Sequence, residues 1–201
     1  LQVVSLLRSL LEALALQLGN EVSTNELSKL VGISRETVER YLDLMERSFI
    51  VYRLRALSRN SRKEIAKSRK VYFYDLGIRN ALIKNFNDLR LRNDVGALWE
   101  NFCVNERMKH NHYTGRMVNP WFWRTYDQKE LDFVEESGGK FAGFEFKWGG
   151  GLARGARAFQ ATYPGSTVEV IEPDNVWDFA GVTVKGPQDE PTGTATASNM
   201  R

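Results

Sequence analysis

Two carboxylates and a lysine with the spacing D-x12-E-x-K form the pattern with the clearest chemical use in this sequence. They are Asp132, Glu145 and Lys147. Carboxylate oxygens bind hard divalent cations such as Mg²⁺, which neutralise a phosphodiester and activate water. A lysine ammonium can orient that water or stabilise the negative charge that develops. The pattern therefore predicts a Mg²⁺ site with the chemistry of phosphodiester cleavage.

The strands that carry these residues follow from the aromatic run over residues 121–148. Its alternation predicts a three-stranded meander with turns at YDQK and ESGG. Side chains two apart on a strand share a face, so Leu131 and Phe133 are expected on the face opposite Asp132. The same rule points Glu145 and Lys147 to one side of strand 141–148. If the register across the ESGG turn allows, Asp132 and Glu145 converge with Lys147 beside them.

A helix is predicted over residues 94–110, with an apolar stripe of Val95, Leu98, Trp99 and Phe102. Glu100 lies on the same helix close to Cys103, so it is expected to be partly buried and to need a partner. It can add a further metal ligand, directly or through water. The alternative for the whole pattern is that an E-x-K pair and two exposed carboxylates occur by chance without a function.

The N-terminal part has the pattern of a helix-turn-helix. Ser23 and Glu26 form a capping box before a short helix that ends at Gly32. Ser34 can cap the next helix, over residues 35–47. The runs FIVYRLR and KVYFYD then predict a hairpin around a basic loop, and together these elements indicate a winged helix.

Charge is concentrated in one segment. The chain carries 28 basic and 25 acidic residues, a net charge of +3. Residues 53–70 alone hold eight basic residues against one glutamate, so this segment carries +7 and the remainder −4. Helix 35–47 has a charge of −1, which disfavours its lying in a DNA groove. Contact with phosphates is expected instead from the hairpin loop, through Arg59, Arg62, Lys63 and Lys67. The alternative is a solvated basic loop or a protein-docking surface.

The composition is that of an ordinary globular protein. The chain has 201 residues, of which 42% are hydrophobic and 26% charged, as in ordinary globular proteins. It has no run of about 20 apolar residues that would span a membrane. A single cysteine, Cys103, suits the reducing cytoplasm. Residues 1–18 are apolar almost all round, which predicts packing on a missing upstream domain, on a second copy or in a central core. Residues 183–201 are expected to be disordered.

The order of these elements resembles the PD-(D/E)XK restriction-endonuclease-like fold. More closely, the chain resembles the C-terminal region, a domain of unknown function, of a prokaryotic family of AAA+ ATPases. The similar stretches are YLDLMERSFIVYRL, KSRKVYFYDLGIRNAL, GALWENF, FWRTYDQKELDFV, FEFKW and AFQATYP. The resemblance implies that Glu100, Asp132, Glu145 and Lys147 occupy the nuclease-like motif positions and that residues 1–18 adjoin the ATPase. Leu131 stands where the motif has proline, and the chain has no phosphate-binding P-loop.

These observations predict an α/β (α+β) fold with a winged-helix domain over residues 19–93 and a three-layer, restriction-endonuclease-like domain over residues 94–182. The leading hypothesis is a nucleic-acid-binding region, with DNA as the expected partner, that cleaves phosphodiesters with Mg²⁺. The expected partners also include the upstream ATPase and, as an open alternative, a second copy in a homo-oligomer. One alternative function is a non-enzymatic interaction module that recruits the ATPase. The other is a transcriptional regulator that acts through the helix-turn-helix.

Overall fold

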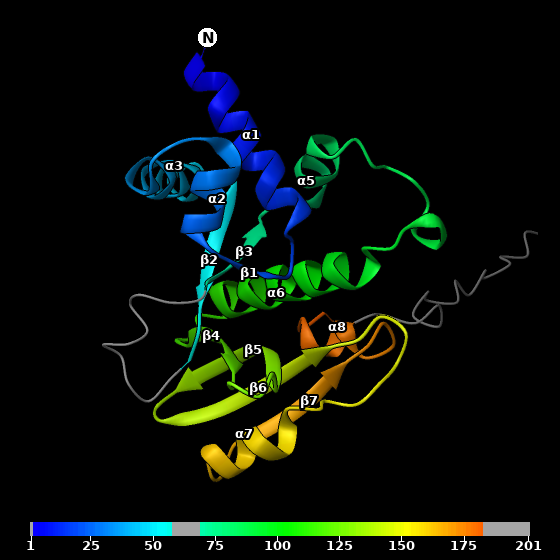
Figure 1. Cartoon of the computed structure of the whole chain (residues 1–201). Coiled ribbons are helices and arrows are strands. Elements are labelled where there is room, and N and C mark those ends of the chain that lie inside the picture. Colours follow the sequence, from blue (N-terminus) through cyan, green and yellow to red (C-terminus); the bar gives the residue numbers. More distant parts are fainter. Residues whose placement is uncertain (1, 58–68, 183–201) are drawn as a thin grey trace, which may run out of the picture.

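The structure is a computed structural model that describes residues 2–57 and 69–182. It has the predicted mixed α/β architecture, with two separate sheets. Figure 1 shows the long helix α6 lying between the N-terminal part and a four-stranded sheet. No helix in the described part of the chain is long and apolar enough to cross a membrane. The predicted phosphate contacts, Arg59, Arg62, Lys63 and Lys67, lie outside the described residues, as does the segment 183–201.

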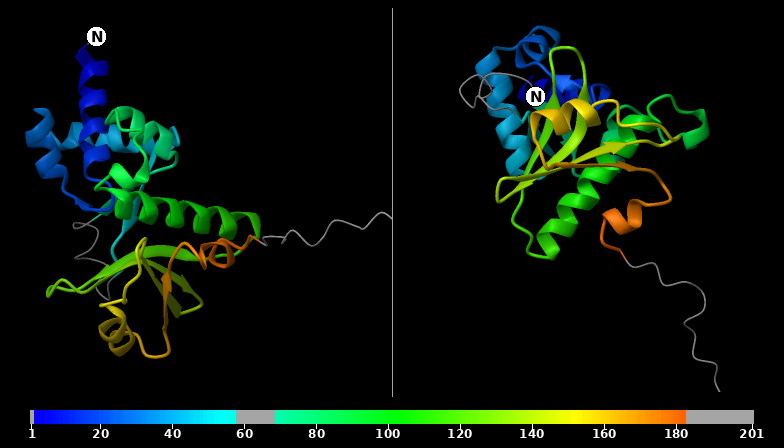
Figure 2. Two further views of the ribbon diagram at one scale, coloured as in Figure 1. Left: turned by 90° about the vertical axis from the view of Figure 1, so that its right-hand side faces the viewer. Right: turned by 90° about the horizontal axis from the view of Figure 1, so that it is seen from below.

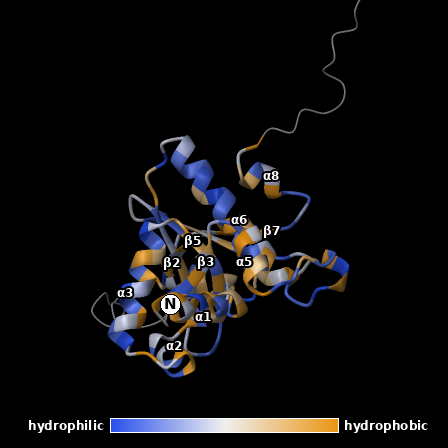
Figure 3. Cartoon of the chain, turned by 90° about the horizontal axis from the view of Figure 1, so that it is seen from above, coloured by the Kyte–Doolittle hydropathy of each residue, from blue (hydrophilic) through white to orange (hydrophobic). Residues whose placement is uncertain are grey.

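The helices at the N-terminus are α1 (Gln2–Leu16), α2 (Thr24–Val31) and α3 (Arg35–Arg47). The predicted caps of α2 and α3 are confirmed. The Ser23 side chain accepts a hydrogen bond from the Glu26 amide, and the Ser34 side chain accepts one from the Thr37 amide. Gly32 ends α2 in the left-handed conformation, at φ +74°. Along α3, hydrophobic and hydrophilic residues alternate (Figure 3), and the predicted stripe of Val38, Tyr41, Leu42 and Met45 is buried.

The first sheet has the order β1-β3-β2 and is antiparallel throughout. Its strands are β1 (Glu21–Val22), β2 (Val51–Arg55) and β3 (Arg69–Phe73). One face contributes Val71 and Phe73 to the core formed with α1–α3. The other face contributes Tyr52 and Tyr72 to a core shared with α6 and the second sheet. The strands of the predicted hairpin are therefore covered on both faces.

The connection to α6 contains two elements that the sequence analysis does not foresee, α5 (Leu76–Leu82) and the 3₁₀ helix η1 (Leu89–Leu91). Asp75 caps α5 by accepting hydrogen bonds from the Gly77 and Ile78 amides. The buried Arg79 side chain then ties α5 to α1 by donating to the Ala15 carbonyl, at 2.9 Å. A stretch with few sequence signals is thus held by side-chain hydrogen bonds.

The second part begins with α6 (Val95–Tyr113) and continues with a sheet of order β4-β5-β6-β7. The strands are β4 (Asn119–Arg124), β5 (Glu130–Ser137), β6 (Lys140–Phe146) and β7 (Thr167–Ile171). The predicted meander of β4, β5 and β6 is antiparallel, and β7 pairs parallel to β6. The connecting helix α7 (Ala156–Thr162) lies on the sheet face opposite α6 (Figure 2), and α8 (Val176–Phe179) follows β7.

A β-bulge in β5 corrects the predicted alternation of side chains. Trp121 pairs with Val134 and Trp123 with Leu131, so two β5 residues, Asp132 and Phe133, oppose the single β4 residue between the tryptophans. As a result Leu131 packs in the cluster that contains Val134, whereas Phe133 packs in the cluster on the α6 side. The prediction that Leu131 and Phe133 share a face is wrong because a bulge inserts one residue and shifts the period of two.

Packing crosses the predicted domain boundary between residues 93 and 94. Leu98 of α6 packs into the core of the N-terminal helices. Tyr52 and Tyr72 of the first sheet pack into the cluster that contains Trp99. An isolated parallel bridge also joins Ala56 to Phe122. The first sheet is therefore held against α6 and the second sheet by a common hydrophobic core.

Candidate functional site

The bulged residue Asp132 lies where β5 and β6 separate. The last regular pair of these strands is Phe133 with Phe144. One step further, the Oδ2 atom of Asp132 accepts the Phe146 amide hydrogen bond at 2.9 Å. The carboxylate thus takes a place that a strand carbonyl fills elsewhere in the ladder, and bulges commonly redirect a side chain in this way.

Glu145 and Lys147 lie beside Asp132. Oε1 of Glu145 accepts a hydrogen bond from Nζ of Lys147 at 2.6 Å. Oε2 is buried, and it has no hydrogen-bond partner within the described part of the chain. Burial, followed by the charge of Asp132, raises the pKa of Glu145. The spacing D-x12-E-x-K therefore brings its three residues together, with one carboxylate oxygen left unpaired.

Glu100 reaches the same place from α6. Its Oε1 accepts hydrogen bonds from the Tyr72 hydroxyl at 2.6 Å and from Nζ of Lys70 at 2.9 Å. Burial raises the pKa of Glu100 to about 7, against the opposing effect of the Lys70 ammonium, and the charge of Asp132 adds to the rise. The expectation that Glu100 is partly buried and needs a partner is confirmed, because its side chain is 13% exposed and two groups of β3 bond to it.

Lys70 is the member of the site that the sequence analysis does not identify. Its side chain is 3% exposed, and its Nζ lies 2.9 Å from Glu100 and 3.6 Å from Oδ1 of Asp132. Burial favours the neutral amine, but the two carboxylates outweigh it and raise the pKa of Lys70. In the sequence Lys70 is one residue of a basic run. Only the packing of β3 on α6 places it between two carboxylates.

Glu130 is a second residue outside the predicted set. Its charge acts on Lys70, Glu145 and Lys147. Gly155 allows α7 to begin against it, because a Cβ at Gly155 would lie 2.2 Å from the Glu130 carbonyl oxygen. We define the carboxylate cluster as Glu100, Glu130, Asp132 and Glu145 with Lys70 and Lys147. With every group ionised, it carries four negative and two positive charges, a net −2.

The cluster offers a metal ion two carboxylates rather than three. Asp132 and Glu145 adjoin each other, and the unpaired Oε2 of Glu145 is the type of buried acceptor that a cation satisfies. The accepting oxygen of Glu100 is already held by Lys70 and Tyr72. Across residues 2–57 and 69–182, no group of three or more His, Cys, Asp or Glu side chains is arranged to bind a metal. Mg²⁺ is often bound by one or two carboxylates and keeps several waters, so the pair fits such an ion.

The basic segment is largely neutralised in the part that the structure describes. The Arg53 guanidinium contacts three carboxylates of α3, and Arg69 contacts Glu39 at 3.1 Å. Lys70 belongs to the carboxylate cluster, and Arg55 is exposed. Among the described residues of this segment, Arg53 and Arg69 therefore pair with the negative charge of α3 and are not free basic groups of the surface.

Comparison with known proteins gives matches of unknown function. A family model described as "Domain of unknown function (DUF8612)" matches residues 2–89, and "Domain of unknown function (DUF4143)" matches residues 95–173. Similar curated proteins are "Uncharacterized protein Rv2008c" of Mycobacterium tuberculosis and "Uncharacterized protein Mb2031c" of Mycobacterium bovis. Each is 29% identical over 134 residues, which cover 64% of this chain and 29% of the relative. The chain thus spans less than a third of the length of these relatives, and no solved structure matches it.

Proposed function

We propose that this chain is the nucleic-acid-binding, nuclease-like region of an AAA+ ATPase and that it cleaves phosphodiesters with a Mg²⁺ ion held by Asp132 and Glu145. The observation that carries the proposal is the buried, unpaired Oε2 of Glu145 beside Asp132. A buried carboxylate oxygen without a partner is unfavourable, and a cation would remove the penalty. When all of its groups are ionised, the carboxylate cluster carries a net charge of −2, which one divalent ion neutralises.

The residues of the cluster other than Glu130 then have distinct roles. A bound Mg²⁺ ion would polarise the phosphodiester and lower the pKa of a bound water. Lys147, one-third exposed, holds Glu145 and presents positive charge toward solvent, where a phosphate would approach. Lys70 and Tyr72 hold Glu100, and Lys70 also balances the charge of Asp132. Lys70 and Glu100 are thus positioning residues of the proposed site.

The test is cleavage of labelled single-stranded and duplex DNA and RNA by the purified chain in Mg²⁺, Mn²⁺ or EDTA. We expect cleavage that depends on the metal and falls at least 100-fold in Asp132→Asn and Glu145→Gln. The matched control is Glu169→Gln, because Glu169 is an exposed carboxylate on the neighbouring strand β7. Absence of metal-dependent cleavage, or equal cleavage by Asp132→Asn, would contradict the catalytic proposal.

The wider assembly is also a proposal. It rests on the resemblance of stretches such as FWRTYDQKELDFV to the region that follows an AAA+ ATPase. We place the region in the cytoplasm, where the buried thiol of Cys103 stays reduced, and propose that it forms a homo-oligomer. Nucleic acid, with DNA as the expected form, is the partner. The test is the ATPase activity of a purified longer form of the protein, measured with and without DNA. Stimulation by DNA would support this arrangement, and ATPase activity unaffected by nucleic acid would oppose it.

A non-catalytic interaction module is the second candidate, and one contact favours it. Lys70 already neutralises part of the charge on Glu100 and Asp132, as a buried structural ion pair does. In that case cleavage would be absent, while salt-sensitive binding to nucleic acid would persist in Asp132→Asn. The same measurements therefore separate the two candidates.

A further inference from the structure

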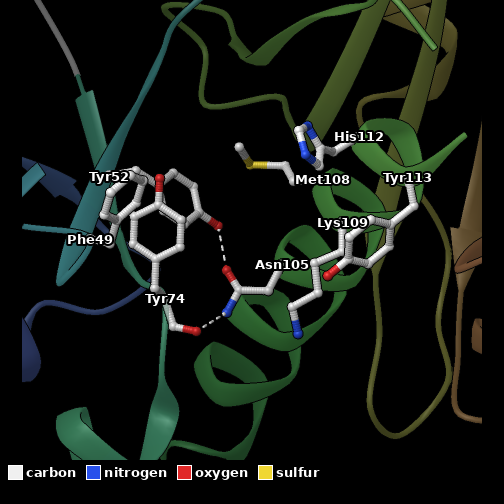
Figure 4. A pocket seen from close by; sticks show the side chains of 8 residues that line it. All are labelled: Phe49, Tyr52, Tyr74, Asn105, Met108, Lys109, His112 and Tyr113. Carbon is white, nitrogen blue, oxygen red and sulfur yellow. Dashed lines mark hydrogen bonds between the residues drawn. The ribbon is translucent and has the colours of Figure 1, made fainter. Parts of the chain in front are cut away.

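A cavity of about 320 Å³ lies between the first sheet and the C-terminal half of α6. Figure 4 shows Phe49, Tyr52 and Tyr74 on one side of it and side chains of α6 on the other. The three rings pack on one another, with centroids 5.7 Å apart for Phe49 and Tyr74 and 5.0 Å for Tyr52 and Tyr74. The volume is at the lower end of the range for small-ligand sites, about 300–1,000 Å³. A cavity of this size can hold a ligand with one flat ring system, but it is small for a segment of another protein.

The α6 side of the cavity is one face of the helix. Asn105, Met108, Lys109, His112 and Tyr113 follow the i, i+3, i+4, i+7, i+8 spacing of a single stripe. Asn105 is buried and fixed, because its side chain accepts from the Tyr52 hydroxyl and donates to the Tyr74 carbonyl. Tyr113 is 79% exposed. The cavity therefore has a rigid floor and an open aromatic rim.

Phe49 occupies a backbone position at which stability favours glycine. Both helices of the helix-turn-helix end in the left-handed conformation, α2 at Gly32 with φ +74° and α3 at Phe49 with φ +54°. The Phe49 and Ile50 amides bond back to Glu46 and Met45, as in the helix ending that usually carries glycine. A phenylalanine in this conformation is strained, and this ring is also 72% exposed. Neither local backbone preference nor core packing accounts for the ring, which leaves a role at the cavity rim.

Basic side chains line the cavity and its surroundings, and some of them are paired: Nζ of Lys109 lies 2.6 Å from Glu106, and Arg53 contacts the carboxylates of α3. Lys109 and His112 line it. A second cavity adjoins it, because Tyr52 and Met108 line both, and this one is lined by Arg53 and the exposed Arg55. No carboxylate is among the described residues that line either cavity. Exposed aromatic rings beside basic groups are the features with which proteins bind unstacked bases of single-stranded nucleic acid.

From this geometry we infer that the aromatic cavity of Phe49, Tyr74 and Tyr113 binds one unstacked base of a single-stranded nucleic acid, with Lys109 and Arg55 near the adjoining phosphates. The inference rests on the proposed function and names its substrate class. Tyr52 connects the two sites, because its ring stacks on Tyr72, whose hydroxyl donates to Glu100. Lys70 and Tyr72 lie two residues apart on β3 and Tyr74 directly follows the strand, so the carboxylate cluster and the cavity lie roughly 13 Å apart along the chain. A short single strand can reach both.

The test compares two labelled 12-nucleotide probes in EDTA, one of oligo(dA) and one of the same length without bases. Both carry the same phosphate charge, so the difference between their affinities reports base binding alone. We expect the wild-type chain to bind oligo(dA) about tenfold or more tightly than the abasic probe. Phe49→Ala and Tyr113→Ala should abolish this preference, whereas Lys109→Gln should weaken binding of both probes by a similar factor.

Matched controls are available on the same chain. Phe86 is 70% exposed and lies outside the cavity, and Tyr126 is fully exposed in the turn between β4 and β5. Phe86→Ala and Tyr126→Ala should keep the preference for bases. Phe49→Gly should lose it without a fall in melting temperature, because glycine suits the backbone there. That variant separates loss of binding from loss of folding.

The outcomes distinguish this inference from the proposed function. Equal affinity for the two probes, or an unchanged preference in both Phe49→Ala and Tyr113→Ala, would overturn the base site. In that case metal-dependent cleavage that still requires Asp132 would leave the proposed function in place. If base binding is lost in the aromatic variants while no cleavage occurs in any metal, the base site stands and the catalytic proposal fails.

Discussion

Two buried carboxylates lie three residues apart on β5, and they are surrounded in opposite ways. Glu135 receives two hydrogen bonds from the Arg107 guanidinium, at 2.8 and 2.9 Å, and further contacts from Asn111 and Arg116. Arg107 also packs over the rings of Phe144 and Phe179. Burial alone would raise the pKa of Glu135, but the hydrogen bonds from Arg107 and Asn111 outweigh it and lower the pKa.

Asp132 lies instead in an excess of negative charge. Its neighbour Glu145 keeps one oxygen unpaired, and burial raises the pKa of both Glu145 and Glu100. The region around Glu135 has two arginines for one carboxylate, whereas the carboxylate cluster has two lysines for four carboxylates. The first arrangement stabilises the contact of α6 with β5. The excess of carboxylates in the cluster lowers the stability of the fold unless a cation binds there. Such a local loss of stability is typical of a functional site.

The largest expected effect is the loss of stability on removing Arg107, the arginine that pairs with Glu135. Arg107→Ala leaves Glu135 buried without its main partner, and such a loss costs about 3–5 kcal/mol of unfolding free energy. Urea denaturation followed by tryptophan fluorescence measures it. Arg157→Ala, at an exposed position of α7, is the control and should change stability by less than about 0.5 kcal/mol. Equal effects in the two variants would show that the Glu135 pair does not hold α6 on the sheet.

The next prediction makes the same isosteric change at both sites. Glu135→Gln removes a charge that arginine satisfies, and we expect a loss of about 2 kcal/mol. Glu145→Gln removes a negative charge that burial and Asp132 disfavour. We therefore expect the unfolding free energy to change by less than about 1 kcal/mol, in either direction. Denaturation of the two variants in metal-free buffer makes the comparison. A loss in Glu145→Gln as large as that in Glu135→Gln would mean that the carboxylate cluster is an ordinary structural ion pair.

The smallest expected effect is on the pH dependence of stability. The pKa of Glu100 is about 7 in the folded chain, above its ordinary value of 4.5. The folded state thus holds this proton more tightly, and the stability that it contributes falls as pH rises from about 4.5 to 7. Glu100→Gln should flatten the decline by about 1 kcal/mol per pH unit between these pKa values, measured by urea denaturation between pH 5 and 8. Glu135, with its lowered pKa, contributes in the opposite sense, because its stabilisation is lost in acid.

Lys70→Met sharpens the same measurement. The Lys70 ammonium lowers the pKa of Glu100, so its removal should raise that pKa further above 7. The carboxyl ¹³C shift of Glu100, assigned with Glu100→Gln, follows the titration in both proteins. An unchanged titration in Lys70→Met would show that the two groups do not interact in solution.

Local sequence signals predicted the parts of the fold that depend on neighbours in the chain. The caps Ser23 and Ser34, the glycine ending at Gly32 and the buried stripe of α3 all follow from spacing within one or two turns. The meander was predictable for the same reason, since its strands are joined by short turns. The bulge at Asp132 was not, because it depends on how β4 pairs with β5.

The candidate site divides in the same way. Asp132, Glu145, Lys147 and Glu100 could be selected by residue type and spacing alone. Lys70 and Glu130 could not, and neither could the pairing of Arg53 with α3. Each of these depends on contacts between segments far apart in the chain, and a basic run in a sequence does not show which of its charges become buried.

Apart from α5 and η1, local backbone preference and periodicity were enough to predict the main helices and strands, the caps of α2 and α3, and the chemical types on β5 and β6. The packing of β3 on α6, in contrast, depends on contacts between segments far apart in the chain. That packing places Lys70 between two carboxylates and brings Phe49 and Tyr74 opposite Tyr113. Burial and charge balance arise from all the segments that meet at one point, so they cannot be assigned to any one stretch of the chain.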